Sequence, residues 1–272
     1  MVVHSSNQKL VYSNVNLRDV THIARYHTEA FPDCLAIAQA DSLIIGRSDE
    51  ILKLHIRTVP LHEQPRRICH LDSVGMFGVV TIQLGAAGDA MDPCFLRLMD
   101  DQLLETVASF AFAPNENPGS VVAMRFAGDD QQYLVVGTGV VLPDEEEPTK
   151  GRVLVFKAVD RSLQLVAELK IKGCAYKMAS LRGKLVAGVN NKVQLYRWAR
   201  RDDDGGCELV SECGHHGHIL ALHLAARGEF ALVGDLMRSV SLLAYRPLDG
   251  ALEEIARDYN AHWMSAVAML GD

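Results

Sequence analysis

The amino-acid sequence predicts an all-β fold, and more specifically an incomplete β-propeller of about five or six four-stranded blades. Helical periodicity is scarce along the chain. Short β-branched and Leu-rich stretches are instead separated by Gly, Asp, Asn and Pro turns. In addition, one pair of apolar segments recurs at about 45 residues, a spacing typical of propeller blades. A β-sandwich would also contain short strands, but it would not repeat one paired motif at this interval.

The repeated pair is an apolar stretch that ends in Gly, followed after a turn by a second apolar strand. The copies are SLIIG with EILKLHIRTV, YLVVG with GRVLVFKAV, KLVAG with KVQLYRW, and FALVG with RSVSLLAY. Their glycines are Gly46, Gly137, Gly188 and Gly234, and the degenerate copy MFGVVTIQL fills the long first interval. We expect each Gly to permit a tight turn, after which the next strand pairs antiparallel. Each blade should then cover the apolar face of its neighbour.

Bulk properties bound the function. The 272 residues are 49% hydrophobic and 22% charged, which is typical of a globular chain with a substantial core. No apolar run approaches the ~18 residues of a membrane span, and the first residues lack a secretory signal pattern. We therefore expect an intracellular protein without a membrane partner. The formal charge of -7 gives no general reason to bind nucleic acid, although a local basic patch remains open. Six cysteines without a CxxC pair predict buried, reduced thiols.

Motifs of catalysis are missing, so we expect a non-enzymatic chain without a cofactor. There is no GxSxG, Walker loop or HExxH, and GTGVVL lacks the later glycine and helix of a dinucleotide turn. The best metal candidate is the string CGHHGH. Its possible ligands are Cys213, His215, His216 and His218, with Cys207 or His223. Zinc needs ligands that converge from well-spaced pairs, whereas alternate strand residues face opposite sides. A polar turn entering the strand HILALHLA is favoured, and no metal site is expected.

Three further features have a structural and a functional interpretation. The acidic run from Asp144 to Glu147 lies between two prolines and predicts a solvated loop, which could meet a basic partner segment. RRDDDGG, residues 200–206, predicts a flexible hairpin tip. Trp198 is expected to pack at a strand end. For Trp263, composition alone slightly favours core packing over docking, although Trp is enriched at interface hot spots.

Long, non-repetitive strings resemble the large subunits of damaged-DNA-binding proteins, the adaptors of a cullin-RING ubiquitin ligase. They are GDLMRSVSLLAYRPLDGALEEIARDYNAHWMSAV, DEILKLHIRTVPLHEQPRRIC, GTGVVLPDEEEPTKGRVLVF and SSNQKLVYSNVNLRDV; only residues 71–130 look divergent. The family has three seven-bladed propellers and a helical C-terminal domain. By this resemblance, residues 1–272 are one domain, a part of the third propeller truncated at both ends. The closing blades, the helical domain and the cullin-binding propeller would be absent.

The resemblance also implies a docking site for substrate-receptor proteins. In the family, a cleft between the first and third propellers holds a helical or loop segment of the receptor, and the third propeller contributes one wall. Carried over to this chain, that wall contains Glu145, Glu147, Tyr176, Ile219, Leu222, Arg238, Arg257 and Trp263, with Glu50 as a weaker candidate. Other expected partners are the remaining propellers of a full-length adaptor, with DNA reached only indirectly through a partner subunit.

Several alternatives stay open. Ile219 and Leu222 lie on a predicted strand and could equally point into the core. Between His215 and His223, His and Gly replace residues expected to be Asn and Tyr, which puts contacts from this strand in doubt. Related large subunits serve splicing and polyadenylation, so the propeller could act in RNA processing with nucleic-acid binding. A truncated gene product without independent function is the remaining alternative; its open blade faces would predict aggregation.

Overall fold

The computed structural model describes residues 2–6, 9–13, 20–32, 34–39, 42–47, 58–85, 92–201 and 205–270. Every regular element in these ranges is a β-strand, which confirms the all-β class. They contain no helix with the length and apolar character needed to cross a membrane. The chain divides into two compact units, a smaller one over Met1–Val59 and a larger one over Pro60–Asp272, and each is treated by itself. The expectation of a single domain stays a prediction.

In its described residues, the larger unit has four antiparallel sheets, and each sheet is a meander of four consecutive strands. The first two sheets contain β6 (Gln64–Leu71), β7 (Met76–Ile82), β8 (Cys94–Asp100), β9 (Thr106–Ala111), β10 (Glu116–Arg125), β11 (Gln132–Val140), β12 (Gly151–Val159) and β13 (Ser162–Ile171). The last two contain β14 (Ala175–Leu181), β15 (Lys184–Val189), β16 (Lys192–Arg200), β17 (Cys207–His216), β18 (Ala221–Arg227), β19 (Phe230–Asp235), β20 (Val240–Arg246) and β21 (Ala251–Arg257).

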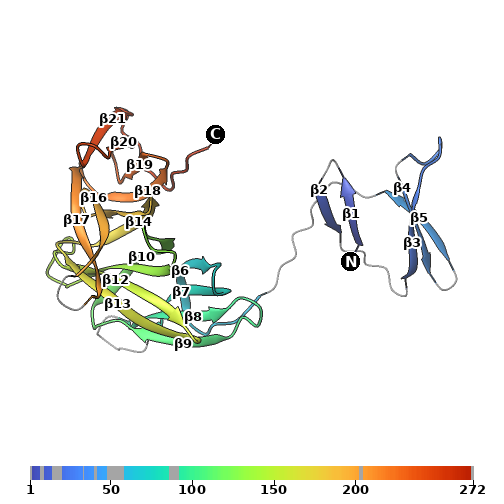
Figure 1. Cartoon of the computed structure of the whole chain (residues 1–272), viewed down its shortest axis with the longest axis horizontal. Helices are drawn as coiled ribbons and strands as arrows, with labels where there is room; N and C mark the ends of the chain where they lie inside the picture. Colours follow the sequence, from blue (N-terminus) through green and yellow to red (C-terminus); the bar gives the residue numbers. More distant parts are fainter. Residues whose placement is uncertain are drawn as a thin grey trace. The chain divides into compact units, whose positions relative to one another are not determined.

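Successive sheets of the larger unit are arranged as propeller blades. The first strands β6, β10, β14 and β18 contact one another in chain order, and so do the fourth strands β9, β13, β17 and β21. Figure 1 shows the same succession, from β6–β9 in cyan and green to β18–β21 in orange and red. Each sheet therefore runs from a shared inner side to the outside, which is the radial arrangement of a propeller. The prediction of a partial propeller is confirmed.

The core of the larger unit lies between neighbouring sheets, in three layers of buried apolar side chains. Leu96 of the first sheet packs with Leu134 and Phe156 of the second, and all three are fully buried. A second layer joins the second and third sheets, and a third layer joins the third and fourth. Trp198 stacks on Phe126 in the second layer, with ring centroids 4.5 Å apart. The interpretation of Trp198 as a packing residue is therefore confirmed.

Gly137, Gly188 and Gly234 lie inside the second strand of their sheets, and the role of the first two differs from the predicted one. The paired strands do form, since β11 pairs with β12, β15 with β16 and β19 with β20. A Cβ at Gly137 would lie 2.6 Å from the Cβ of Ala175, and one at Gly188 would lie 2.6 Å from the carbonyl oxygen of Ala221. Neither glycine has a positive φ. The expectation that these glycines permit tight turns was thus wrong: Gly137 and Gly188 let the first strand of the following sheet approach closely.

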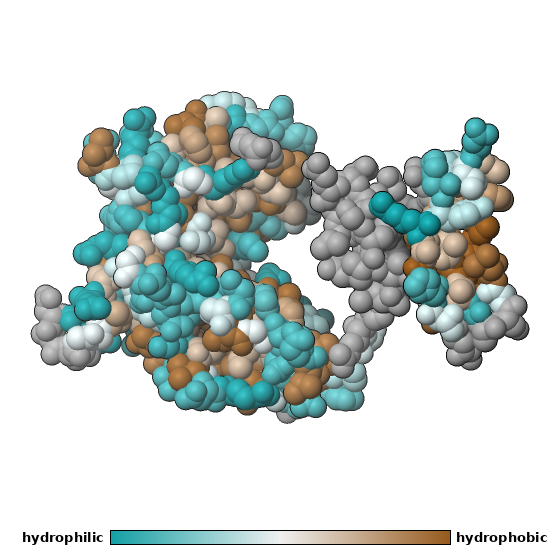
Figure 2. All heavy atoms as spheres, turned by 45° about the vertical axis from the view of Figure 1, so that its right-hand side comes forward, coloured by the Kyte–Doolittle hydropathy of each residue, from teal (hydrophilic) through white to brown (hydrophobic). Residues whose placement is uncertain are grey.

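The described part of the smaller unit contains five strands in two sheets. β1 (Val2–Ser6) pairs with β2 (Lys9–Ser13), while β3 (Val20–Tyr26), β4 (Cys34–Gln39) and β5 (Leu43–Arg47) form a three-stranded sheet. The side chains of Leu43 (67% exposed) and Ile45 are uncovered, and brown atoms gather on one side of this unit in Figure 2. Most of the predicted strand EILKLHIRTV, together with Glu50, lies outside the described residues.

All six cysteines are described, and none of them forms a disulfide. Cys34, Cys94 and Cys174 are buried, whereas the other three are partly exposed, so the prediction of buried thiols holds for half of the set. Burial raises the pKa of the Cys69 and Cys174 thiols to about 12. Such thiols stay protonated at neutral pH and are poor nucleophiles.

Candidate docking face

Every described docking candidate lies at or next to one edge of the four sheets. In a four-stranded meander, the second strand ends and the third begins at the same edge at which the fourth strand leaves for the next sheet. We call this the loop edge, and it contains the loops 141–150, 172–174, 190–191, 217–220, 236–239 and 258–263. Glu145 and Glu147 lie in the first of these loops, and Trp263 lies in the last. The remaining candidates lie in the loops or the adjoining strand ends: Tyr176, Ile219, Leu222, Arg238 and Arg257.

The acidic run forms a loop between β11 and β12, as predicted. Thr149 donates hydrogen bonds to Glu145 through its hydroxyl (3.0 Å) and its backbone amide (3.3 Å), so this carboxylate is used within the loop. Glu147 is exposed and close enough to Tyr176 to affect the phenol electrostatically. Burial, then Cys174 and Glu147, raise the pKa of Tyr176 to about 12. Tyr176 is therefore a neutral hydrogen-bonding group beside an exposed negative charge.

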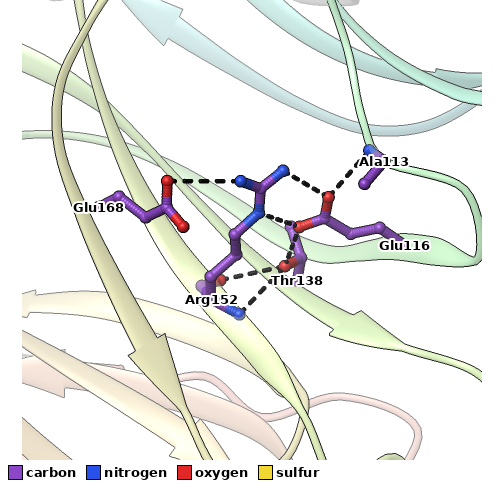
Figure 3. A network of polar contacts seen from close by, with 5 residues as sticks. All are labelled: Ala113, Glu116, Thr138, Arg152 and Glu168. Atoms are coloured by element: carbon purple, nitrogen blue, oxygen red, sulfur yellow. Dashed lines mark hydrogen bonds and ion pairs between the residues drawn. The ribbon is translucent and has the colours of Figure 1, made fainter.

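A buried ion pair lies at the base of the acidic loop (Figure 3). Glu116, at the start of β10, is only 3% exposed and accepts two hydrogen bonds from Arg152 at 2.6 and 2.7 Å. The hydroxyl of Thr138 and the amide of Ala113 also donate to Glu116, and Glu168 lies 3.4 Å from the Arg152 guanidinium. Burial opposes ionisation of Glu116, but the donors from Arg152, Thr138 and Ala113 outweigh it and hold its pKa below the ordinary value. The network fixes the two strand ends that carry the loop.

The first strand of each sheet in the larger unit has a β-bulge near the loop edge. The register shifts occur between Pro65 and Arg67, Pro118 and Ser120, Ala175 and Lys177, and Ala221 and His223. The extra residues are Arg66, Gly119, Tyr176 and Leu222. A bulge leaves one residue out of the ladder and redirects its side chain. Two of the docking candidates, Tyr176 and Leu222, are thus bulge residues whose side chains are not fully buried. No sequence signal marks a bulge at these two positions.

Ile219 and Leu222 do not belong to the core. Ile219 is 37% exposed and Leu222 is half-buried, whereas their neighbours Ala221 and Leu224 belong to the layer between the third and fourth sheets. The bulge explains the difference, because Leu222 lies at the shift in register between two residues that pair with β19. The question that the sequence left open is thereby settled in favour of an accessible position for both residues.

Trp263 projects from a segment that is anchored on both sides. The carbonyl oxygen of His262 accepts a hydrogen bond from the Ser239 amide (3.2 Å), and Nε2 of His223 lies 3.0 Å from the carbonyl oxygen of Met264. With its neighbours held against the fourth sheet, the Trp263 side chain is 75% exposed. The core-packing interpretation from composition was therefore wrong, and the exposed position suggested by the resemblance is observed.

The two candidate arginines differ in availability. Arg238 lies exposed in the β19–β20 loop, and its guanidinium has no ion-pair partner among the described residues. Arg257 instead pairs with Glu254, donates to the Ser241 hydroxyl (3.3 Å) and lies over the ring of Tyr259 at 5.9 Å. The Arg238 guanidinium is therefore accessible, whereas the Arg257 guanidinium would have to give up its contacts with Glu254 and Ser241 before it could bind another group.

Asn190 and Asp235 belong to the loop edge, although nothing in their sequence context singled them out. Both come at the end of a second strand, directly after a repeated Gly or one residue later. The Asp235 carboxylate accepts hydrogen bonds from the amides of Ile219 (2.9 Å), Met237 (3.0 Å) and Arg238 (3.1 Å). It thereby joins the connection before β18 to the loop that carries Arg238. The available signal was only a polar residue after an apolar strand, which is common in turns.

The strand and turn around CGHHGH contain no converging set of ligands. Cys213, His215 and His216 lie in β17, and Nε2 of His215 is 3.5 Å from Glu254. Over the ranges that the structure describes, no three His, Cys, Asp or Glu side chains are grouped so that they could hold a metal ion. The favoured turn before β18 is observed at residues 217–220. The residues Asp202–Asp204 of the predicted hairpin tip lie outside the described ranges.

Comparison with known proteins places this chain in a family. The family described as "CPSF A subunit region" matches residues 94–272. DNA damage-binding protein 1a of Arabidopsis thaliana is 51% identical over 271 residues, and DNA damage-binding protein 1 of Solanum lycopersicum is 50% identical over 273. Each alignment covers 100% of this chain and 25% of the relative, so the chain spans about a quarter of the length of these proteins. By the matched region and the blade arrangement, the chain belongs to the family of the CPSF A subunit region.

Proposed function

We propose that this chain is part of a non-enzymatic propeller adaptor, and that its loop edge docks substrate receptors of a cullin-RING ubiquitin ligase. The observation that carries the proposal is the gathering of all eight described docking candidates at one edge of the sheets. Half of the set is apolar or aromatic and half is charged. Residues far apart in sequence gather there on strand ends and on the loops between them, an arrangement suited to protein recognition.

The chemistry of the loop edge favours a helical or loop segment with an apolar face and charged ends. Trp263, Ile219 and Leu222 offer accessible apolar surface on the fourth sheet and on the segments directly before and after it. A helix placed on such a surface would use apolar residues at i, i+3 or i+4 and i+7. Arg238 would attract an acidic group of this segment, and the exposed Glu147 a basic one. Charges of both signs at separate places define one orientation of the bound segment.

The relatives are named for damaged-DNA binding, and we extend this to the chain only through a partner. Under this proposal, the adaptor brings a receptor that reads damaged DNA, or another target, to the ligase. This work would take place in the nucleus and the cytoplasm.

The test is capture of receptors from nuclear extract with the purified chain, after light scattering has shown that it is monomeric. Parent chain is compared with Trp263→Ala plus Arg238→Ala, and bound proteins are identified by mass spectrometry. A matched control, Leu248→Ala plus Arg246→Ala, removes one exposed apolar side chain and one exposed arginine from the opposite edge. The proposal predicts propeller-type substrate receptors with the parent and the control, and their loss with the loop-edge variant. Recovery of the same receptors with all three proteins would refute it.

A second candidate, RNA processing, rests only on the resemblance to the large subunits of splicing and polyadenylation complexes. It predicts that the parent chain retains labelled single-stranded RNA on a filter at 150 mM salt. The proposed adaptor function predicts no retention, because the chain has a formal charge of -7 and phosphate contacts need a basic face.

A further inference from the structure

Asn190, in the turn between β15 and β16, forms hydrogen bonds through all four of its polar atoms. Its φ is 48°, in the left-handed region that Asn adopts several-fold more often than most residues. Its side-chain Oδ1 accepts from the Cys174 amide (2.7 Å), and its Nδ2 donates to the carbonyl oxygen of Pro148 (2.9 Å). Its backbone amide donates to the carbonyl oxygen of Cys174 (3.2 Å), and its own carbonyl oxygen accepts from the Ala221 amide (2.8 Å).

These bonds reach three segments that are distant in the sequence. Pro148 belongs to the acidic loop with Glu145 and Glu147. Cys174 comes two residues before Tyr176, and Ala221 lies between Ile219 and Leu222. One side chain and its backbone therefore connect the three segments that contain or adjoin five of the eight described docking candidates.

The surroundings of Asn190 are adapted to this role. Gly173 has a φ of 127°, and a Cβ there would lie 2.6 Å from Asn190 Oδ1, so only Gly leaves room for the amide. In the next sheet, the Asp235 carboxylate likewise accepts a hydrogen bond from the connection before the first strand, at the Ile219 amide, and a second one from the Arg238 amide in its own β19–β20 loop. In two sheets, therefore, a polar side chain at the end of the second strand accepts a hydrogen bond from the connection before the first strand. The repetition indicates a general feature of the loop edge and not an isolated turn.

We infer that Asn190 is a positioning residue of the docking face, which holds the acidic loop, the loop before β14 and the start of β18 in the geometry that a partner meets. This inference rests on the proposed function. A face that is ordered before binding loses less conformational freedom on association, and affinity rises accordingly. Asn190 is half-buried and acts through the loops that it holds.

Two substitutions separate its contacts. Asn190→Gly keeps the left-handed backbone and removes both side-chain bonds, while Asn190→Asp keeps an acceptor for Cys174 and removes the donor to Pro148. Hydrogen–deuterium exchange is measured for the whole chain. We expect faster exchange at Cys174 and in residues 141–150 for Asn190→Gly, and only in residues 141–150 for Asn190→Asp. The control is Asp160→Gly, which replaces an exposed left-handed residue (φ 47°) at the opposite edge and should leave the loop edge unchanged.

Affinity for a purified receptor from the capture experiment gives the second readout. We expect binding about two- to tenfold weaker for Asn190→Gly, from the loss of hydrogen bonds that order the loops. Unchanged exchange in Asn190→Gly would overturn the inference, and so would faster exchange with unaltered affinity. If the parent captures no receptor, the proposed function fails, and exchange alone then decides whether Asn190 holds the loops.

Discussion

Replacement of Gly137 by Ala tests the packing that brings neighbouring sheets together. The new methyl group would lie 2.6 Å from the Cβ of Ala175 and 3.0 Å from Sδ of Met178, both on the first strand of the following sheet. Carbon atoms prefer a separation of about 3.5–4.0 Å, so the two sheets must part by roughly 1 Å. Overpacking of this kind costs about 2–3 kcal/mol. The lower backbone entropy of Ala offsets about 0.5–1 kcal/mol of that cost.

The net loss in the free energy of unfolding is therefore about 1–2.5 kcal/mol. For a unit of this size, that corresponds to a fall in Tm of roughly 2–10 °C. Thermal unfolding followed by Trp198 fluorescence is a local assay, because Trp198 packs in the same layer as Ala175 and Met178. Gly46→Ala is the matched control, since no described atom lies within 4 Å of the added Cβ, and it should leave the Tm of the larger unit unchanged. A Gly137→Ala protein as stable as the parent would refute the close-approach explanation.

Three further predictions follow from the burial or exposure of single side chains. Folding lowers the pKa of Glu116, so the ionised carboxylate stabilises the folded state at pH values above its ordinary pKa of 4.5, and this stabilisation is lost as the pH falls through the lower folded pKa. Glu116→Gln should therefore lower the free energy of unfolding in urea by about 3 kcal/mol at pH 7, and by less below pH 4. A thiol reagent at pH 8 should label Cys69 and Cys174 only after denaturation, and rapid native labelling would contradict their raised pKa. Acrylamide should quench the fluorescence of the exposed Trp263 more strongly than that of the partly buried Trp198, and equal quenching of the two would contradict this difference in exposure.

Much of the fold could be predicted from the sequence, because a strand pair and its turn are local. The apolar stretches around Gly137, Gly188 and Gly234 predicted three pairs of strands that the structure contains. The reason for the glycines could not be predicted in the same way. It depends on atoms of the following sheet, such as Ala175 and Ala221, which come about 35 residues later in the chain.

The docking face was less predictable for the same physical reason. Trp263 is exposed because contacts with Ser239 and His223 hold its neighbours, and neither contact is local in sequence. Leu222 is accessible because its strand contains a bulge, while the alternating pattern of residues 219–224 fits a regular strand equally well. Asn190 looked like an ordinary turn residue, since its partners Pro148 and Cys174 become neighbours only in the folded chain.

The most direct test of the account is a dissociation constant, measured by calorimetry with one purified receptor from the capture experiment. Parent chain, the loop-edge variant Trp263→Ala plus Arg238→Ala, and the opposite-edge control are compared after equal Tm values have been established. The account predicts a one-to-one complex for the parent and the control. It predicts at least a tenfold weaker complex for the loop-edge variant, since loss of two hot-spot side chains costs more than about 1.4 kcal/mol. Equal affinity of all three proteins would contradict docking at the loop edge.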